Sequence, residues 1–334
     1  MIFECLHDFE EIEQRILKGQ SLLIAADANL MDKLPAGRWI GGTIPYFMTD
    51  LGGICTAKKI FITELDAVAA DISVKTYDEN TLANVYLDIP ENGFSFIIIP
   101  AESRCHLAFS MEAFSYKDFA LRPLIGWIAG THLDERGIEK PGIYDGINHR
   151  QLQEGAVVMH VELQAGMAAE IGMLNMFEQG SGDTISFAES GFAAKDAYIN
   201  GEKVNFAKYI LEHKLDLRLP LVANVNGTPI NTSFRRSIGT DGEVRFYAPA
   251  FKDLDYRHAK AIENYPEKFT EKLSLGLGTE LIFSCNCILN YLYSGLDKHS
   301  GGGLCGPATF GEIAYHIHNQ TVVYLRIIHN KSLI

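Results

Sequence analysis

The chain has 334 residues, of which 47% are hydrophobic and 21% are charged, so it is long and apolar enough to bury a substantial core. Its formal net charge of −13 repels phosphate backbones and anionic lipid, so we expect neither nucleic acid nor a membrane surface as a partner. The N-terminal stretch lacks the pattern of a signal peptide, and no stretch is apolar over the length of a membrane span. We therefore expect a folded cytoplasmic protein.

The first half of the chain reads as mixed helix and sheet. Asp8 and Glu11 predict a capped amphipathic helix that ends at Gly19. Next come a predicted buried strand, a short helix and a second strand or loop, at residues 21–27, 29–35 and 38–53. Continuous apolar runs then predict central strands at 94–101, 123–130 and 155–163, with a helix at 105–114.

From about Asp183 the chain changes to short strands separated by turn pairs that tolerate positive φ angles. These pairs are Asn200-Gly201, Asn226-Gly227 and Asp241-Gly242. An antiparallel meander with one helix at 206–215 is predicted, followed by a strand at 279–286, a helix at 287–293 and a glycine loop that leads into closing strands. We predict an α+β fold: two packed mixed α/β parts, with largely antiparallel sheets flanked by helices and a packed boundary near residue 215.

Six cysteines are scattered along the chain, and without a secretory signal reduced thiols are the default expectation. Cys285, Cys287 and Cys305 are close enough in sequence to form a soft metal site with His316 or His318, although buried free cysteines are a common alternative. As a catalytic nucleophile, Cys285 would need a nearby base, for which His318 is the candidate. All three interpretations stay open.

The closing segment FGEIAYHIHNQTVVYLRI, residues 310–327, places several polar side chains in what otherwise reads as core strand. His316 and His318 share one face of a strand and could present two imidazoles to a metal or a haem iron, or could be hydrogen-bonded structural residues. Asn319 and Gln320 are then either pocket or hinge residues, or members of an internal network that fixes the strand.

Arg235 and Arg236 are neighbours in a strand-like segment, so one of them must point inward. An inward arginine needs an anionic partner, either a protein carboxylate or the acid group of a ligand. The glycines at residues 38–42 and 300–306 match no dinucleotide-binding or Walker loop, which favours surface turns over nucleotide binding.

In this order the segments resemble the FIST family of bacterial intracellular sensory domains. The best matches are RRSIGTDGEVRFYAPAFKDLDYRHA (235–259), ELIFSCNC (280–287) and the closing segment with its Gly-Glu-Ile and His-Asn-Gln-Thr. The N-terminal half matches more loosely, for example in LPAGRWIGGTIPYF (34–47). Two features depart from the family: the bulky turn GTIPYFMTDLGG (42–53), and Ile288 where a basic residue is expected.

The resemblance implies a FIST N-terminal-like domain at residues 1–215 and a FIST C-terminal-like domain at 216–334. It implies a sensor of amino acids or similar metabolites without catalytic activity. The family often signals through an attached output module, for which this chain has no length left, so we expect a separate signalling partner protein. Some family members bind haem and respond to nitric oxide. The candidate ligand-binding residues are Arg235, Cys285, Asn286, Glu312, His318, Asn319 and Gln320, with His318 as the iron ligand if haem is bound and no other metal.

Three alternatives accompany this expectation. The first is a cysteine- or metal-dependent hydrolase that uses Cys285 with His318. The second is the haem-binding nitric-oxide sensor, and the third is a protein-interaction scaffold without any ligand.

Overall fold

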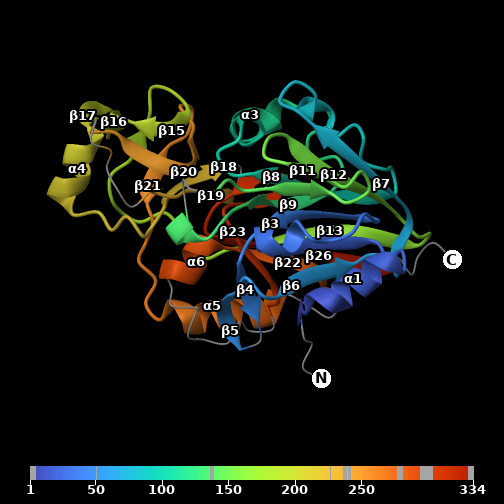
Figure 1. Cartoon of the computed structure of the whole chain (residues 1–334). Helices are drawn as coiled ribbons and strands as arrows, with labels where there is room; N and C mark the ends of the chain where they lie inside the picture. The colour runs from blue at the N-terminus through green and yellow to red at the C-terminus, as the bar shows by residue number, and fades with distance from the viewer. Residues whose placement is uncertain are drawn as a thin grey trace.

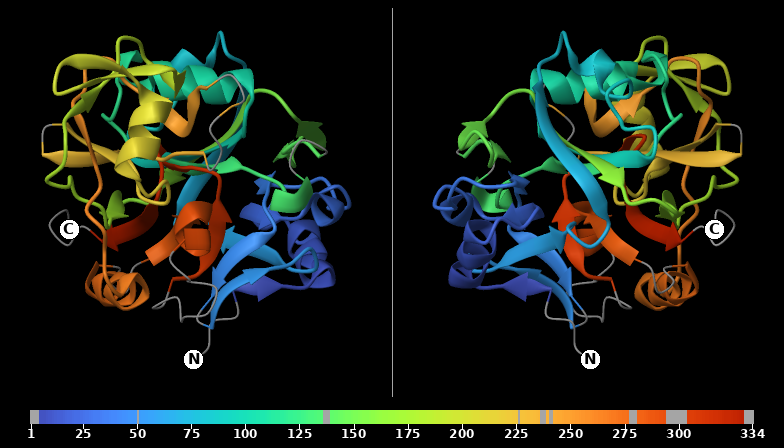
Figure 2. Two further views of the ribbon diagram at one scale, coloured as in Figure 1. Left: turned by 90° about the vertical axis from the view of Figure 1, so that its left-hand side faces the viewer. Right: turned by 90° about the vertical axis from the view of Figure 1, so that its right-hand side faces the viewer.

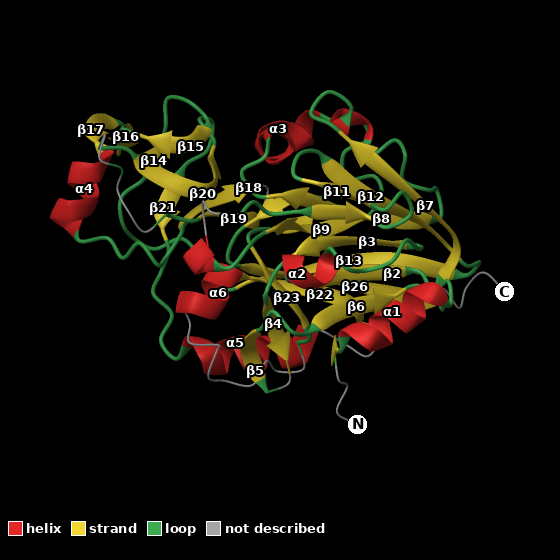
Figure 3. Ribbon diagram, in the orientation of Figure 1, coloured by secondary structure: helices red, strands yellow, loops and turns green. Residues whose placement is uncertain are grey.

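The structure, a computed structural model, describes residues 5–49, 51–135, 139–225, 227–235, 239, 242–276, 281–293 and 304–329. These parts of the chain form a layered body and a smaller lobe at one end of it, which is coloured yellow to orange in Figure 1 and is seen from two further sides in Figure 2. Strands pair mostly antiparallel and helices lie on the outside, so the predicted α+β class is confirmed (Figure 3). In the described part of the chain, no helix has the length and apolar character needed to cross a membrane.

The N-terminal sheet carries two helices on its outer face. Its strands, in spatial order, are β1 (Leu6–His7), β6 (Ile60–Glu64), β2 (Leu22–Ala26), β3 (Trp39–Thr43), β10 (Ile143–Asp145) and β11 (Arg150–Leu152). The helices are α1 (Phe9–Leu17) and α2 (Ala28–Met31). Ile12 and Ile16, one helical turn apart, bury the inner face of α1 against β2 and β3. Asp8 holds the N-cap position, but its carboxylate pairs with Lys59 at 2.9 Å and does not cap the helix.

The central sheet is the middle layer of the body. Its strands, in spatial order, are β25 (His316–His318), β24 (Glu312–Ala314), β9 (Leu124–Ala129), β8 (Gly93–Pro100), β12 (Ala156–Leu163) and β7 (Ala69–Tyr77). The helical segments on its outer face are α3 (Arg104–Glu112), η1 (Leu82–Asn84) and η2 (Ala113–Ser115), and η3 (Leu133–Glu135) follows β9. The predicted strands β8, β9 and β12 are buried on both faces, as their continuous apolar runs indicate.

The C-terminal sheet is completed by the last described strand of the chain. Its strands, in spatial order, are β13 (Met167–Asn175), β26 (Thr321–His329), β22 (Leu281–Cys287), β23 (Gly306–Thr309), β4 (Tyr46–Thr49) and β5 (Gly52–Cys55). The helices α5 (Tyr265–Gly276) and α6 (Ile288–Tyr293) accompany it, and Phe269 and Leu273 of α5 pack on Met48 and Val322. One shared core joins this sheet and the N-terminal sheet to the inner face of the central sheet.

The lobe has its own core and two sheets of its own, one of six strands and one of two. Its elements are β14 (Ile185–Ser186), β15 (Gly191–Ala194), β16 (Asp196–Ile199), β17 (Glu202–Asn205), α4 (Phe206–His213), β18 (Leu221–Val225), β19 (Thr228–Thr232), β20 (Val244–Ala250) and β21 (Tyr256–His258). Asn200 and Gly201 form the expected positive-φ turn between β16 and β17, whereas Asn226 and Asp241 lie outside the described residues. Residue 215 falls between α4 and β18, so the boundary at 215 divides the six-stranded lobe sheet, in which β14 lies between β16 and β21, and β21 lies next to β18.

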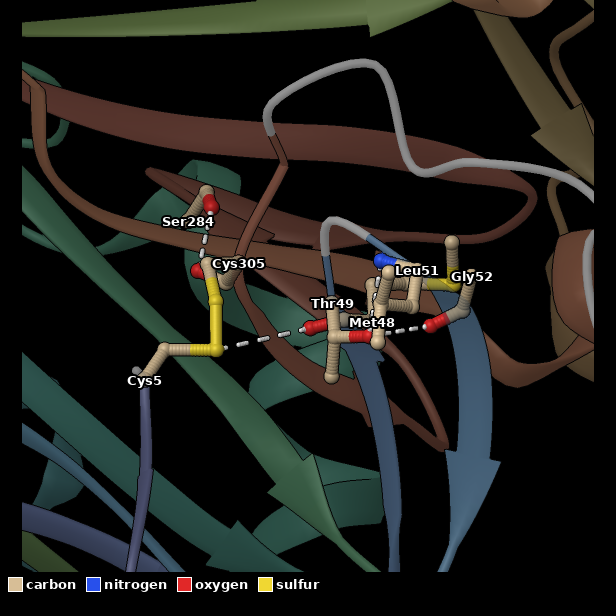
Figure 4. Close-up of a disulfide and its surroundings, with 7 residues drawn as sticks. All are labelled: Cys5, Met48, Thr49, Leu51, Gly52, Ser284 and Cys305. Carbon is tan, nitrogen blue, oxygen red and sulfur yellow. Dashed lines mark hydrogen bonds between the residues drawn. A yellow bond between two sulfur atoms is a disulfide. The ribbon is translucent and has the colours of Figure 1, made fainter. Parts of the chain in front are cut away.

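A disulfide joins Cys5 to Cys305, with Cα atoms 6.2 Å apart and 300 positions between them in sequence (Figure 4). The expectation that all six cysteines are reduced is therefore wrong for this pair. Pairing of β23 with β4 brings the two residues together, since Cys305 directly precedes β23 and Cys5 Sγ lies 4.0 Å from the carbonyl oxygen of Met48 in β4. Three of the free cysteines are buried, and Cys55 is exposed.

Candidate functional site

An apolar groove of about 370 Å³, which we call the His-pair groove, lies between the body and the lobe. β25 is the edge strand of the central sheet and β13 is the edge strand of the C-terminal sheet, and both strands contribute to the groove. The body lines it with Phe114, Phe119, Ala120, Ile171, Gly172, Met173, Ala314, Tyr315, His316 and His318. The lobe lines it with Val225, Thr228 and Ile230.

Strand alternation in β25 places both histidines on this groove. Ile317 packs into the core beneath α3, so His316 and His318 point to the opposite face. The two imidazole rings lie 4.0 Å apart between centroids, and Phe114 packs 4.5 Å from the ring of His316. The histidine pair therefore forms a polar spot on a wall that is otherwise mostly apolar, with Thr228 and Tyr315 as the other polar residues of the lining.

Backbone carbonyls determine which nitrogen of each ring carries the proton. His316 donates from Nδ1 to the carbonyl oxygen of Ile317 at 2.8 Å, and His318 donates from Nε2 to that of Ala314 at 3.2 Å. A carbonyl oxygen only accepts, so in each neutral ring the other nitrogen is a bare acceptor. Within the described residues, Nε2 of His316 and Nδ1 of His318 have no hydrogen-bond partner.

Both imidazoles are held neutral. Burial lowers the pKa of His318 to about 4. Burial and the neighbouring His318 lower the pKa of His316 well below its ordinary value. The described lining contains no lysine, arginine, aspartate or glutamate, so the groove presents hydrogen-bond acceptors without a charge.

A larger depression of about 430 Å³ lies beside α5, but its chemistry is that of an ordinary surface. Its charged lining residues, Glu178, Lys260, Lys268, Glu271 and Lys272, are all exposed. Exposed charges of this kind bind a ligand weakly because they are already well hydrated. We therefore take the His-pair groove as the candidate site.

Asn319 and Gln320, two of the predicted site residues, fasten the turn between β25 and β26 to the lobe. Gln320 has a φ of 51°, and its side-chain amide donates to the carbonyl oxygen of Arg218 and accepts from the Ser233 hydroxyl, at 2.9 and 2.7 Å. The carbonyl oxygen of Asn319 accepts from Asn231 at 2.9 Å. The internal-network interpretation thus describes these two residues, although Gln320 also lines a separate pocket of about 220 Å³ near α5 and α6.

Glu312, Cys285 and Asn286 lie in the sealed core, each with no exposed surface. The Glu312 carboxyl accepts from the Thr321 hydroxyl at 2.9 Å and backbone amide at 3.3 Å, and lies 3.2 Å from the Thr309 hydroxyl. Burial raises the pKa of Glu312 to about 8. The Asn286 side chain accepts from another core amide at 3.0 Å. Of the predicted ligand-binding residues, only His318 lines the His-pair groove.

The predicted Cys285–His318 pair makes no hydrogen bond. The Cys285 thiol faces the carbonyl oxygen of Gly126 at 3.6 Å, and burial raises its pKa well above the ordinary value, which opposes thiolate formation. The predicted cluster of Cys285, Cys287 and Cys305 as three free thiols is wrong because Cys305 is in the disulfide. No cluster of three or more potential His, Cys, Asp or Glu metal ligands occurs among the described residues.

Arg235 has a protein partner. Its guanidinium lies 3.2 Å from the carboxylate of Glu102 in the loop before α3, and its Nε donates to the carbonyl oxygen of Phe246 at 3.1 Å. This contact ties the segment after β19 to the body. Arg236 lies outside the described residues.

Sequence reasoning missed most of the groove. Phe114, Met173 and Ile230 come from three distant segments, and each reads as an ordinary core residue. The alternating His-Ile-His pattern was the one available signal, and it pointed to His316 as much as to His318.

Comparison with known proteins gives a family but no annotated relative. The model of a family of unknown function (DUF6976) matches residues 7–328, a range that includes the body, the lobe and the whole lining of the groove. No curated protein matches the chain.

Proposed function

Since the chain belongs to a family of unknown function (DUF6976), we propose a function from its own residues: a small-ligand-binding sensory protein of the FIST type, with the His-pair groove as its ligand site. One observation carries the proposal. Two neutral imidazoles, each with an unpartnered acceptor nitrogen, face an apolar groove. Concave apolar surfaces with a few convergent polar groups are the usual form of small-molecule sites.

The position of the groove suits a sensor because the body and the lobe both contribute to its lining. A ligand that touches β25 and β13 of the body and β18 and β19 of the lobe would stabilise the arrangement in which these strands meet. The proposal assigns the output to a separate signalling partner protein that reads the position of the lobe. It includes no catalysis, and it places the protein in the cytoplasm.

A metabolite screen by thermal shift tests the proposal. A ligand present at a hundred times its dissociation constant should stabilise the protein by about 2.7 kcal/mol. Thr228 is exposed on the lobe side of the groove, so Thr228→Trp should fill the groove and abolish the shift. Thr76→Trp, at an exposed position of β7 on the opposite edge of the central sheet, is the matched control and should respond like the wild type.

Equal thermal shifts in the wild type and Thr228→Trp would show that the ligand binds outside the His-pair groove. A screen without any stabilising compound would favour the alternative of a scaffold that binds proteins alone. If a core cysteine reacted with a thiol reagent at a pH well below the ordinary cysteine pKa, this would instead favour the hydrolase alternative.

Haem is the second candidate, because one histidine has the arrangement that an iron ligand needs. A carbonyl holds the Nδ1 proton of His316, which leaves Nε2 free for the metal, as in many ligating histidines. In His318 the carbonyl holds Nε2 itself. The geometry thus favours His316 over His318, the iron ligand that the FIST resemblance implies. The described lining offers no cation for the haem propionates.

Titration with haem tests this candidate. A Soret band that is lost in His316→Ala and kept in His318→Ala would support ligation by His316. The reverse pattern would assign the iron to His318. Absence of a band in the wild type would remove haem from consideration.

A further inference from the structure

We infer that the ligand of the His-pair groove is an uncharged, ring-containing molecule that donates a hydrogen bond through an O–H or N–H group. The inference rests on the proposed function and narrows it to one chemical class. It also departs from the resemblance, which implies amino acids and therefore a zwitterionic ligand.

The absence of charge in the described lining excludes an ionic ligand. An ammonium or carboxylate group gives up its hydration when it enters an apolar site, and only an opposite charge or several hydrogen bonds compensate for that loss. The described lining supplies no lysine, arginine, aspartate or glutamate, and its two histidines are neutral. The Gln320 side chain is hydrogen-bonded to Ser233 and Arg218 and lines a different pocket, so it does not supply the missing polar contacts.

The histidines require a donor from the ligand. His316 and His318 each donate their single ring proton to a backbone carbonyl, so both rings line the groove with one bare acceptor nitrogen each. A ligand that covered these nitrogens without a donor would strip their water and leave them unpaired, which costs affinity. A ligand with an O–H or N–H group replaces the lost water.

The shape and composition of the walls favour a ring. Phe114 packs against His316 with ring centroids 4.5 Å apart, and Phe119 lies on the same wall. Flat rings gain extra contact energy against such aromatic surfaces in offset or edge-to-face geometry. Met173 of β13 and Ile230 of β19 add apolar surface to the lining, and a methionine side chain adapts to an irregular outline.

A series of compounds with one ring and one variable group tests the inference. We would titrate the full-length protein, with ¹⁵N-labelled histidine, with 4-methylphenol, 4-methylanisole, toluene, 4-methylbenzoate and 4-methylbenzylamine, and follow the imidazole nitrogen resonances. 4-Methylphenol should bind at least about tenfold more tightly than 4-methylanisole, because methylation removes the donor. The carboxylate and the ammonium compounds should leave the resonances of His316 and His318 unchanged.

Two variants test whether the histidines cause the preference for 4-methylphenol over 4-methylanisole. In His316→Ala the affinity ratio between 4-methylphenol and 4-methylanisole should fall toward one, and in His149→Ala, which changes an exposed histidine away from the groove, it should stay as in the wild type. Equal binding of the phenol and the anisole in the wild type, or tighter binding of either charged compound, would overturn the inference. If none of the five compounds binds while a metabolite still stabilises the protein and Thr228→Trp blocks it, the inference falls and the proposed function stands. If no metabolite stabilises the protein either, both the inference and the proposed function are wrong.

Discussion

Glu312 is a carboxyl group sealed in the core, and replacing it with glutamine should stabilise the protein more and more as the pH rises. Burial raises the pKa of Glu312 from 4.5 to about 8. Between these two values the folded state keeps a proton that the unfolded state has lost, so the free energy of unfolding falls as the pH rises through this window. The protein has the full stability linked to this proton only below pH 4.5, the pKa of Glu312 in the unfolded state.

The contacts of the carboxyl group show why glutamine is a close substitute. Thr321 donates to one oxygen through its amide and its hydroxyl, so that oxygen is an acceptor. The other oxygen, when protonated, can donate to the Thr309 hydroxyl, which in turn reaches the carbonyl oxygen of Gly311 at 3.2 Å. The oxygen and the NH₂ group of glutamine reproduce both roles without a titrating proton.

The pKa shift of Glu312 determines how much free energy of unfolding the substitution gains. At about 1.4 kcal/mol per pKa unit, the buried carboxyl group costs the wild type less than about 1 kcal/mol at pH 5, about 3 kcal/mol at pH 7 and about 5 kcal/mol at pH 9. Glu312→Gln should therefore gain about 4 kcal/mol on the wild type between pH 5 and pH 9.

Urea unfolding at these three pH values measures the difference. Glu162→Gln, at an exposed position of β12, controls for the loss of a carboxylate and should follow the wild type. If the wild type and Glu312→Gln lose stability in parallel as the pH rises, Glu312 is ionised in the fold and the reasoning from its burial fails.

Three further predictions concern other parts of the molecule. Loss of the disulfide, by reduction or by Cys5→Ser, should lower the free energy of unfolding by up to about 6 kcal/mol, because the closed loop spans 300 positions; an unchanged denaturation midpoint would contradict this. Burial lowers the pKa of His160 to about 4, so its folded form stays neutral and stability is lost as the pH falls from about 6.5 toward 4. The wild type should lose about 2 kcal/mol more than His160→Gln between pH 7 and pH 5, and equal losses in calorimetry would rule out this origin. Arg235→Ala should cost about 1 kcal/mol in urea unfolding, less than a buried arginine would, because Arg235 is 32% exposed and its partner Glu102 is 56% exposed; a loss of several kcal/mol would show that the pair is sealed from water in solution.

Local sequence patterns predicted the helices and strands of the body better than they predicted which strands lie next to each other. The run at residues 94–101 predicted β8 because a strand covered on both faces must be apolar at consecutive positions, and Ile12 and Ile16 predicted the buried face of α1. Nothing local indicates that β26 pairs with β13, about 150 positions earlier, or that Cys305 meets Cys5. Such contacts depend on how distant segments pack, which no periodicity records.

The same limit applies to the candidate site. His318 was predicted because it lies in the FIST-like His-Asn-Gln-Thr match, whereas Phe114 and Met173 carry no signal that separates a groove from a core. Glu312 and Cys285 were predicted for their chemistry as well, yet their strands turn them into the sealed interior. Residue type indicates what a side chain can do, and only the packing decides whether a ligand reaches it.

β26 is the last described strand of the chain, and it is an interior strand of its sheet, between β13 at the edge and β22. During translation, more than a hundred further residues must therefore leave the ribosome after β13 before its pairing partner β26 is synthesised. Until then its edge, and the apolar faces that the three sheets share, stay open to chaperones and to other nascent chains. The lobe, whose strands lie between β13 and β22 in sequence, can fold during this delay, so the body should be completed after the lobe has already formed.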